Sequence, residues 1–139
     1  MAEKKSKKSS TITITKTKKK TGALVSDHGR AYIAATFNNT MITITNSKGD
    51  TIAWGSSGSS GFKGTRKSTP YAATIAVESA VKKAVGKGLK TVDVYIKGPG
   101  SGRDSALRAI KTGGLSISLI SDITPIPHNG PRPKKKRRI

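Results

Sequence analysis

Residues 55–73 read GSSGSSGFKGTRKSTPYAA, and they mark the change from strand-like to helix-like sequence. The Gly and Ser residues at the start disfavour both a helix interior and a central strand, so they predict a flexible loop. Ser68-Thr69-Pro70 predicts a helix start, because Ser and Thr side chains cap free N–H groups and Pro suits the first turn. Lys63, Arg66 and Lys67 precede that start, and the stretch contains no acidic residue. A cationic loop that enters a helix N-terminus favours the binding of anions such as phosphate.

The chain is basic in its middle as well as at its ends. Its 139 residues include 27 Lys and Arg against 7 Asp and Glu, for a formal net charge of +20. Residues 1–20 carry a net +7 and residues 130–139 a net +6, which leaves +7 for residues 21–129. Basic ends alone suit nucleic acid, an acidic membrane surface or solubility. A middle that is also basic favours nucleic acid.

Composition divides the chain into three segments. We expect disordered basic tails at 1–20 and 122–139, the second Pro-rich and extended, around one α/β domain at 21–121. Residues 11–15 alternate like a strand, but their lysine-rich flanks predict pairing only after docking. The absence of Cys excludes disulfides and thiolate metal sites and fits a reducing compartment. No apolar run reaches membrane-spanning length or resembles a signal segment, so we expect a soluble protein without an export signal.

Alternating apolar and polar residues predict strands, and apolar residues spaced three or four apart predict helices. The predicted elements are strands at 30–37, 41–46 and 51–55, a helix at 70–85, a strand at 91–97, a short helix after the glycine loop 98–103, and a strand at 115–120. The first three strands should form an antiparallel meander, whereas strands joined by helices should be parallel. The order βββαβαβ therefore predicts an α/β fold with a mixed sheet and helices on its faces, in three layers.

The aromatic residues are few. Phe37 falls on the same strand face as Ala31, Ile33 and Ala35, and Trp54 lies on the strand before the basic loop. Core packing is the preferred interpretation of Trp54 over stacking on a base. With so few aromatic residues, we do not expect stacked single-stranded bases to dominate recognition.

Signals for catalysis or cofactors are weak. Arg103 stands where a dinucleotide fingerprint needs its third Gly, and residues 61–68 lack the second Gly of a Walker A motif. The acidic residues are scattered, and neither His28 nor His128 has a Cys or a second His nearby. We therefore expect no catalytic residue, no metal and no cofactor. Two glycine loops that carry cations into helix starts favour phosphate contact instead.

Four motifs follow one another along the chain: FNNT at 37–40, GFKGTRKSTPYAA at 61–73, KGPGSGR at 97–103 and DITPIPHNG at 122–130. With these motifs the chain resembles, over about residues 21–139, the bacterial type of ribosomal small-subunit protein family eleven. Members of that family often have Cys where Pro131 stands here, a difference that should stiffen the tail.

The resemblance implies a ribonuclease H-like fold without the catalytic acids. It also implies a place on the platform of the small subunit, bridging helices of 16S-type ribosomal RNA and lining the Shine–Dalgarno cleft near the messenger exit. The implied partners are that RNA, small-subunit proteins seven and eighteen, initiation factor three and messenger RNA, with no membrane. The implied location is the cytoplasm, with an organellar ribosome left open.

We therefore expect a non-catalytic RNA-binding protein. Basic side chains of its body would contact phosphates, its glycine loop would let RNA approach the backbone, and its Pro-rich tail would thread between RNA helices. The candidate RNA-binding residues are Lys63, Arg66, Lys67, Ser68, Gly98, Gly100, Gly102, Arg103, Arg108, His128, Asn129, Arg132, Lys134, Lys135, Lys136, Arg137 and Arg138. Two other classes stay open: a free nucleic-acid enzyme, opposed by the scattered acids, and a nucleoid-like DNA-binding protein, which basic tails alone would permit.

Deletion of residues 1–20 and 131–139 should remove much of the salt-dependent affinity for RNA, because the two tails hold 14 of the 27 basic residues. If about six phosphate contacts are lost, the slope of log K against log salt should become shallower by about 4–5 units. Titration of 16S-type RNA at several salt concentrations measures the slope, and circular dichroism checks that the body still folds. An unchanged slope would mean that the tails do not touch the RNA.

Overall fold

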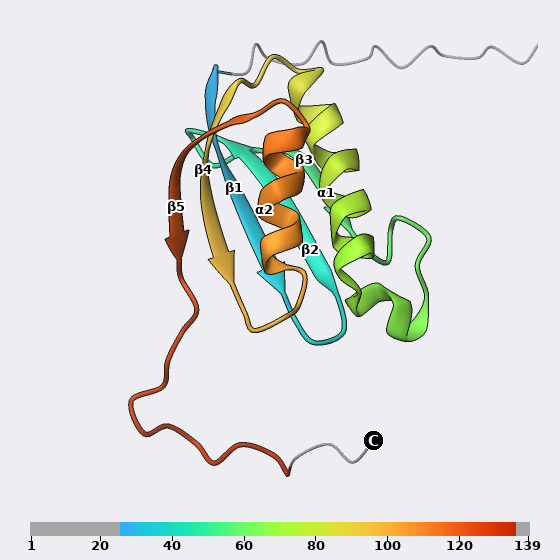
Figure 1. The fold of residues 1–139 in the computed structure, drawn as a ribbon. Coiled ribbons are helices and arrows are strands. Elements are labelled where there is room, and N and C mark those ends of the chain that lie inside the picture. The colour runs from blue at the N-terminus through green and yellow to red at the C-terminus, as the bar shows by residue number, and fades with distance from the viewer. Residues whose placement is uncertain (1–25, 136–139) are drawn as a thin grey trace, which may run out of the picture.

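The computed structural model describes residues 26–135, which form one sheet with two α-helices (Figure 1). In chain order the elements are β1 (His28–Ala35), β2 (Thr40–Asn46), β3 (Thr51–Ser56), the 3₁₀ helix η1 (Gly64–Ser68), α1 (Pro70–Val85), β4 (Thr91–Lys97), α2 (Arg103–Thr112) and β5 (Ser116–Asp122). The predicted order βββαβαβ is confirmed, and each predicted strand agrees with an observed one to within two residues at either end. The alternating segment 11–15 lies outside the described residues.

The sheet is mixed, with the strand order β3-β2-β1-β4-β5. β2 pairs antiparallel with β1 and β3, which is the predicted meander. β4 pairs parallel with β1 and β5, as expected for strands joined through helices. This α/β arrangement fits the ribonuclease H-like fold that the resemblance implies.

Both helices cover the same face of the sheet (Figure 1). α1 packs on β2, β3 and α2, while α2 reaches β1 and β5. The connections β3–α1–β4 and β4–α2–β5 both advance toward β5, and right-handed crossovers that advance in one direction place their helices on one side. The described residues therefore form two layers instead of the three predicted.

The core lies between the helices and the face they cover. Alternate strand residues point into it and are buried, namely Ala31, Ile33, Ile42, Ile44, Val92, Val94 and Ile96. α1 contributes small side chains, so the helix lies close to the sheet, as its sequence predicts. A Cβ at Gly55 on β3 would lie only 2.7 Å from the carbonyl oxygen of Ala76 on α1. A side chain at Gly55 would therefore push the helix away from the strand.

The other face of the sheet is not covered by any described residue. Trp54 lies on that face, in register with Thr43, and is 59% exposed. The interpretation of Trp54 as a core residue is wrong, because its neighbours Ala53 and Gly55 are buried and the helices cover only one face. Tyr32 and Tyr95 stack on the same open face, with 5.3 Å between ring centroids. Among the described residues, no helix is both long enough and apolar enough to span a membrane.

The substitution Ala76→Leu should lower the free energy of unfolding by about 1–3 kcal/mol, because the added carbons overpack the contact between α1 and β3. Lys83→Leu, at an exposed position of the same helix, is the control and should change stability by less than about 0.5 kcal/mol. Urea denaturation followed by circular dichroism compares the two variants. Parent-like stability of the Ala76→Leu variant would contradict a tight helix–strand contact.

Candidate nucleic-acid interface

The loops that follow β1, β3 and β4 lie at one end of the sheet, which is the lower end in Figure 1. These three strands run in the same direction, so their C-terminal ends meet. The loops span residues 36–39, 57–69 and 98–102, and the tail leaves β5 at the same end. We call these loops, together with residues 123–135, the carboxyl edge.

Hydrogen bonds join the loops of the carboxyl edge to one another and to the sheet. The amide of Gly100 donates to the Ala35 carbonyl at 2.8 Å, which ties the loop 98–102 to the end of β1. The Ser101 hydroxyl donates to the Ser68 carbonyl at 2.8 Å, which ties the same loop to the start of α1. The predicted anion-binding loops are therefore parts of one surface.

The loop 57–69 begins as a turn held by serine side chains. The amide of Ser56 donates to the Ser59 hydroxyl oxygen at 2.9 Å, and the amide of Ser59 donates to the Ser56 hydroxyl oxygen at 3.0 Å. The Gly- and Ser-rich run is thus a hydrogen-bonded turn, where the sequence suggested an open flexible loop. The Thr69 side chain accepts from the Ala72 amide at 3.3 Å and Pro70 opens α1, so the predicted helix start is confirmed.

The cations of this loop are available to an anion. Lys63 and Arg66 are exposed and help to line a hollow of about 320 Å³, while Lys67 is half-buried. None of the three forms an ion pair with another residue of 26–135. The N-terminal ends of α1 and α2 both lie at the carboxyl edge and add partial positive charge to it. This end of the molecule therefore has the electrostatic character of a phosphate-binding surface.

The glycines of the second loop make room for protein atoms. Gly100 is buried, and a Cβ there would collide with the carbonyl groups of Ala35 and Thr36. Gly102 is also buried, and a Cβ there would collide with the Thr40 side chain. Sequence reasoning explained these glycines by the approach of RNA to the backbone. The structure supplies a different reason, which is the close packing of Gly100 against the end of β1 and of Gly102 against the start of β2 and α1.

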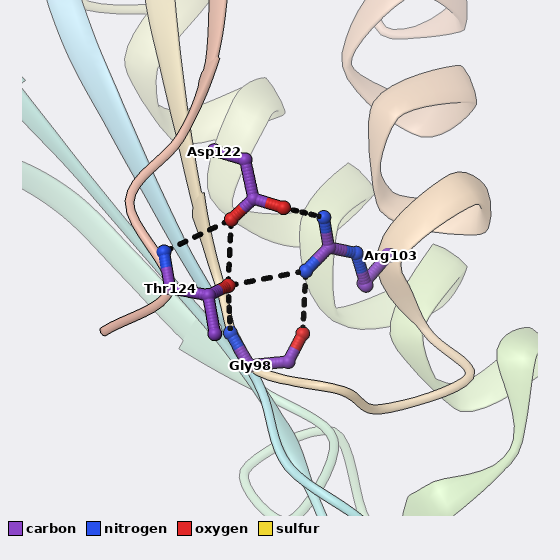
Figure 2. A network of polar contacts seen from close by, with 4 residues as sticks. All are labelled: Gly98, Arg103, Asp122 and Thr124. Atoms are coloured by element: carbon purple, nitrogen blue, oxygen red, sulfur yellow. Dashed lines mark hydrogen bonds and ion pairs between the residues drawn. The ribbon is translucent and has the colours of Figure 1, made fainter. Parts of the chain in front are cut away.

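Arg103 forms hydrogen bonds and an ion pair with other residues of the same chain (Figure 2). Its Nη1 donates to the Gly98 carbonyl at 2.6 Å, and its Nη2 pairs with Asp122 Oδ2 at 2.5 Å. Thr124 completes the network, since its hydroxyl donates to Asp122 Oδ1 at 2.6 Å and accepts from the Gly98 amide at 3.1 Å. The network holds together the glycine loop, the first turn of α2 and the start of the tail. Arg103 thereby orients the tail at the carboxyl edge.

The pKa of Asp122 is lowered to about 2, first by the hydrogen bond from the Thr124 hydroxyl and then by the one from Arg103. Both donors favour the ionised carboxylate over the protonated acid. The amide of Ile123 next to it donates to the Ile96 carbonyl of β4 at 2.8 Å. The start of the tail is therefore held by ionic and backbone contacts at neutral pH.

The other predicted binding residues lie on exposed surfaces or beyond the described chain. Arg108 is exposed on α2. The tail segment 125–135 is exposed throughout, and within it Asn129 has a left-handed backbone with φ of 56°. The exposed candidates of this segment are His128, Asn129, Arg132, Lys134 and Lys135. Lys136, Arg137 and Arg138 lie outside the described residues.

Sequence reasoning missed the exposed aromatic residues in the carboxyl edge and in the adjoining first turn of α1. Phe37 is 75% exposed and Tyr71 is 67% exposed, and the Tyr71 ring meets Phe62 edge to face with 6.0 Å between centroids. The Asn-Asn pair after Phe37 was the available signal, because Asn favours turns, and the turn closed between Thr36 and Asn39 contains Phe37. Residues 26–135 contain no group of three or more His, Asp or Glu that could hold a metal ion.

Comparison with known protein families gives a match over most of the chain. The sequence model of the family described as Ribosomal protein S11 matches residues 29–138. The matched region includes the whole sheet except its first residue, both helices and all the loops of the carboxyl edge.

The contact of Asp122 with Arg103 and Thr124 should weaken only in strong acid. Because the folded pKa of Asp122 lies below the ordinary value of 3.8, its stabilising effect is complete above about pH 4 and is lost as pH falls through about 2. NMR titration of the Asp122 carboxyl carbon measures the midpoint, and hydrogen exchange of the Ile123 amide reports release of the tail. An Asp122→Asn variant should show faster Ile123 exchange at neutral pH. A carboxyl midpoint near 3.8 would contradict the network.

Proposed function

Since residues 29–138 match its model, the chain belongs to the ribosomal protein S11 family, and from that premise we propose how it binds ribosomal RNA. Members of the family are structural proteins of the small ribosomal subunit that bind ribosomal RNA. The chain is accordingly a small-subunit ribosomal protein that serves translation. Our proposal concerns the surface it uses and its place in the subunit.

The carboxyl edge is the proposed RNA-binding surface. The observation that carries this proposal is the convergence of Lys63, Arg66 and Lys67 with two helix N-termini at one end of the sheet. Cations without acidic partners, beside the partial positive charge of two helix N-termini, suit the phosphates of a polyanion. Contacts of this kind fix the position of the protein on RNA without reading its sequence.

Each group of candidate residues has a distinct role in this proposal. Lys63, Arg66 and Lys67 contact phosphates, with Ser68 beside them at the helix start. The loop of Gly98, Gly100 and Gly102 keeps the second helix N-terminus next to the RNA. Arg103 orients the tail, and the exposed part of its guanidinium group faces RNA. Arg108 adds charge along α2. The tail residues that thread between RNA helices are His128, Asn129, Arg132, Lys134, Lys135, Lys136, Arg137 and Arg138.

We assign the protein to the platform of the small subunit, where it bridges helices of 16S-type RNA and helps to form the Shine–Dalgarno cleft near the messenger exit. Its proposed neighbours are small-subunit proteins seven and eighteen, with initiation factor three and messenger RNA nearby. The setting is a cytoplasmic ribosome or an organellar one. Crosslinking within assembled subunits, followed by mapping of the linked RNA helices and proteins, tests this placement.

Sedimentation of a cell lysate separates the ribosomal function from the other two classes. A ribosomal protein should be found almost entirely in the small-subunit peak. A free nucleic-acid enzyme or a nucleoid-like DNA-binding protein would sediment largely outside that peak. Recovery of most of the protein with chromosomal DNA would overturn the proposed function.

The double substitution Arg66→Gln and Lys67→Gln should weaken binding to 16S-type RNA and make the salt slope shallower by about 1.4–1.8 units, which corresponds to two lost phosphate contacts. The matched control is Lys82→Gln with Lys83→Gln, which removes the same charge from the opposite end of α1. The control should leave the slope closer to that of the parent. Equal changes in the two double variants would mean that binding depends on net charge and not on the carboxyl edge.

A further inference from the structure

Phe37 lies outside the core although its sequence position continues an inward strand face. Ala31, Ile33 and Ala35 are fully or almost fully buried, whereas Phe37 two residues later is 75% exposed. β1 ends at Ala35, so the alternation no longer controls the direction of the Phe37 side chain. Exposure of so large an apolar ring forgoes the free energy of burial in the isolated protein.

Hydrogen bonds hold the turn that carries Phe37. The amide and hydroxyl of Thr36 both donate to the Asn39 carbonyl at 2.9 Å, and the Asn39 amide donates back to the Thr36 hydroxyl oxygen at 3.1 Å. These bonds close the chain on both sides of Phe37. The backbone that carries the exposed ring is therefore held in a turn and need not be ordered on binding.

The turn lies between the two other loops of the carboxyl edge. On one side, the Gly100 amide bonds to the Ala35 carbonyl at 2.8 Å, and Gly100 packs against the backbone of Thr36. On the other side, the Ser57 amide bonds to the Thr40 carbonyl at 3.0 Å. Phe37 thus stands between the glycine loop and the loop that carries the free cations Lys63 and Arg66.

We propose that Phe37 is a stacking platform for an unpaired base of ribosomal RNA bound at the carboxyl edge. The inference rests on the proposed function and adds a second kind of contact to it. The cations bind the phosphates of the RNA strand. The Phe37 ring stacks on a base that points from the strand toward the protein. A neighbouring protein is the less favoured occupant, because the loop beside the turn carries Lys63, Arg66 and Lys67 without an ion pair among the described residues, whereas Asp104 is the acid in the first turn of α2.

The chemistry of the ring defines the ligand class. A phenyl ring has no hydrogen-bond donor or acceptor, so it stacks on any base without reading the base edge. Stacking requires a base that is outside a continuous duplex, because a paired base is already covered on both faces. The ligand is therefore an unpaired nucleotide of any identity, in a single-stranded or bulged segment.

Equilibrium binding of the full chain to 16S-type RNA transcribed in vitro tests the proposal. Phe37→Leu keeps an apolar side chain but removes the π face, and it should weaken binding about 5- to 150-fold at fixed salt. The salt slope should not change, because no phosphate contact is lost. Phe37→Trp should bind at least as tightly as the parent. Trp54→Leu, which removes an exposed aromatic ring from the open sheet face, should bind like the parent.

Fluorescence gives an independent test. In a Trp54→Phe background, Phe37→Trp places the only indole of the chain at the turn, and stacking on a base should quench its emission. A ten-nucleotide single-stranded oligoadenylate and a blunt RNA duplex of equal charge serve as probes. Quenching by the single strand and not by the duplex is expected. Equal quenching by both probes would overturn the assignment of an unpaired base.

Each remaining outcome identifies which idea fails. Parent-like RNA affinity of the Phe37→Leu variant overturns the stacking platform. If that variant keeps RNA affinity but enters small subunits poorly when the other ribosomal proteins are present, Phe37 contacts a protein, and the inference is also overturned. Failure of the parent chain to bind 16S-type RNA would instead overturn the proposed function. Thermal melting of each variant checks that the fold is intact.

Discussion

Parallel strands that are joined by right-handed crossovers end at one edge of a sheet, and the functional geometry of this protein depends on that constraint. β1, β3, β4 and β5 all end at the carboxyl edge, so the loops that follow them are neighbours in space although residues 36 and 98 are far apart in sequence. The same crossovers point the N-termini of α1 and α2 at this edge. Loops, helix dipoles and the start of the tail therefore form a single surface.

The basic residues of this surface act in two different ways. Lys63 and Arg66 are exposed and form no ion pair within residues 26–135, so their charge is available to an anion. Arg103 is bound to Asp122 and to the Gly98 carbonyl. An arginine that already has an acidic partner gains less from a phosphate, because its charge is partly compensated. Its main contribution is the direction in which the basic tail leaves the domain.

Placement of both helices on one face has a second consequence. It leaves Tyr32, Trp54 and Tyr95 on the open face of the sheet, within strands and not in the loops of the carboxyl edge. The exposed Phe37 differs from them because its hydrogen-bonded turn lies between the glycine loop and the loop that carries Lys63 and Arg66. Exposure alone does not identify a binding residue, since single exposed apolar side chains are common on protein surfaces. The electrostatic surroundings of the ring distinguish Phe37 from Trp54.

The sequence alone determined the element order, the helix start at Thr69-Pro70 and the basic character of the loops, because these follow from local periodicity, capping and charge. Its motifs also indicated the family. Tertiary structure decided which face of the sheet each helix covers. Because both helices cover one face, Trp54 on the other face is exposed. Tertiary structure also decided that Gly100 accommodates protein atoms and that Arg103 pairs with Asp122, nineteen residues away. These properties depend on which segments meet in space, and local patterns carry no information about a partner that is distant in sequence.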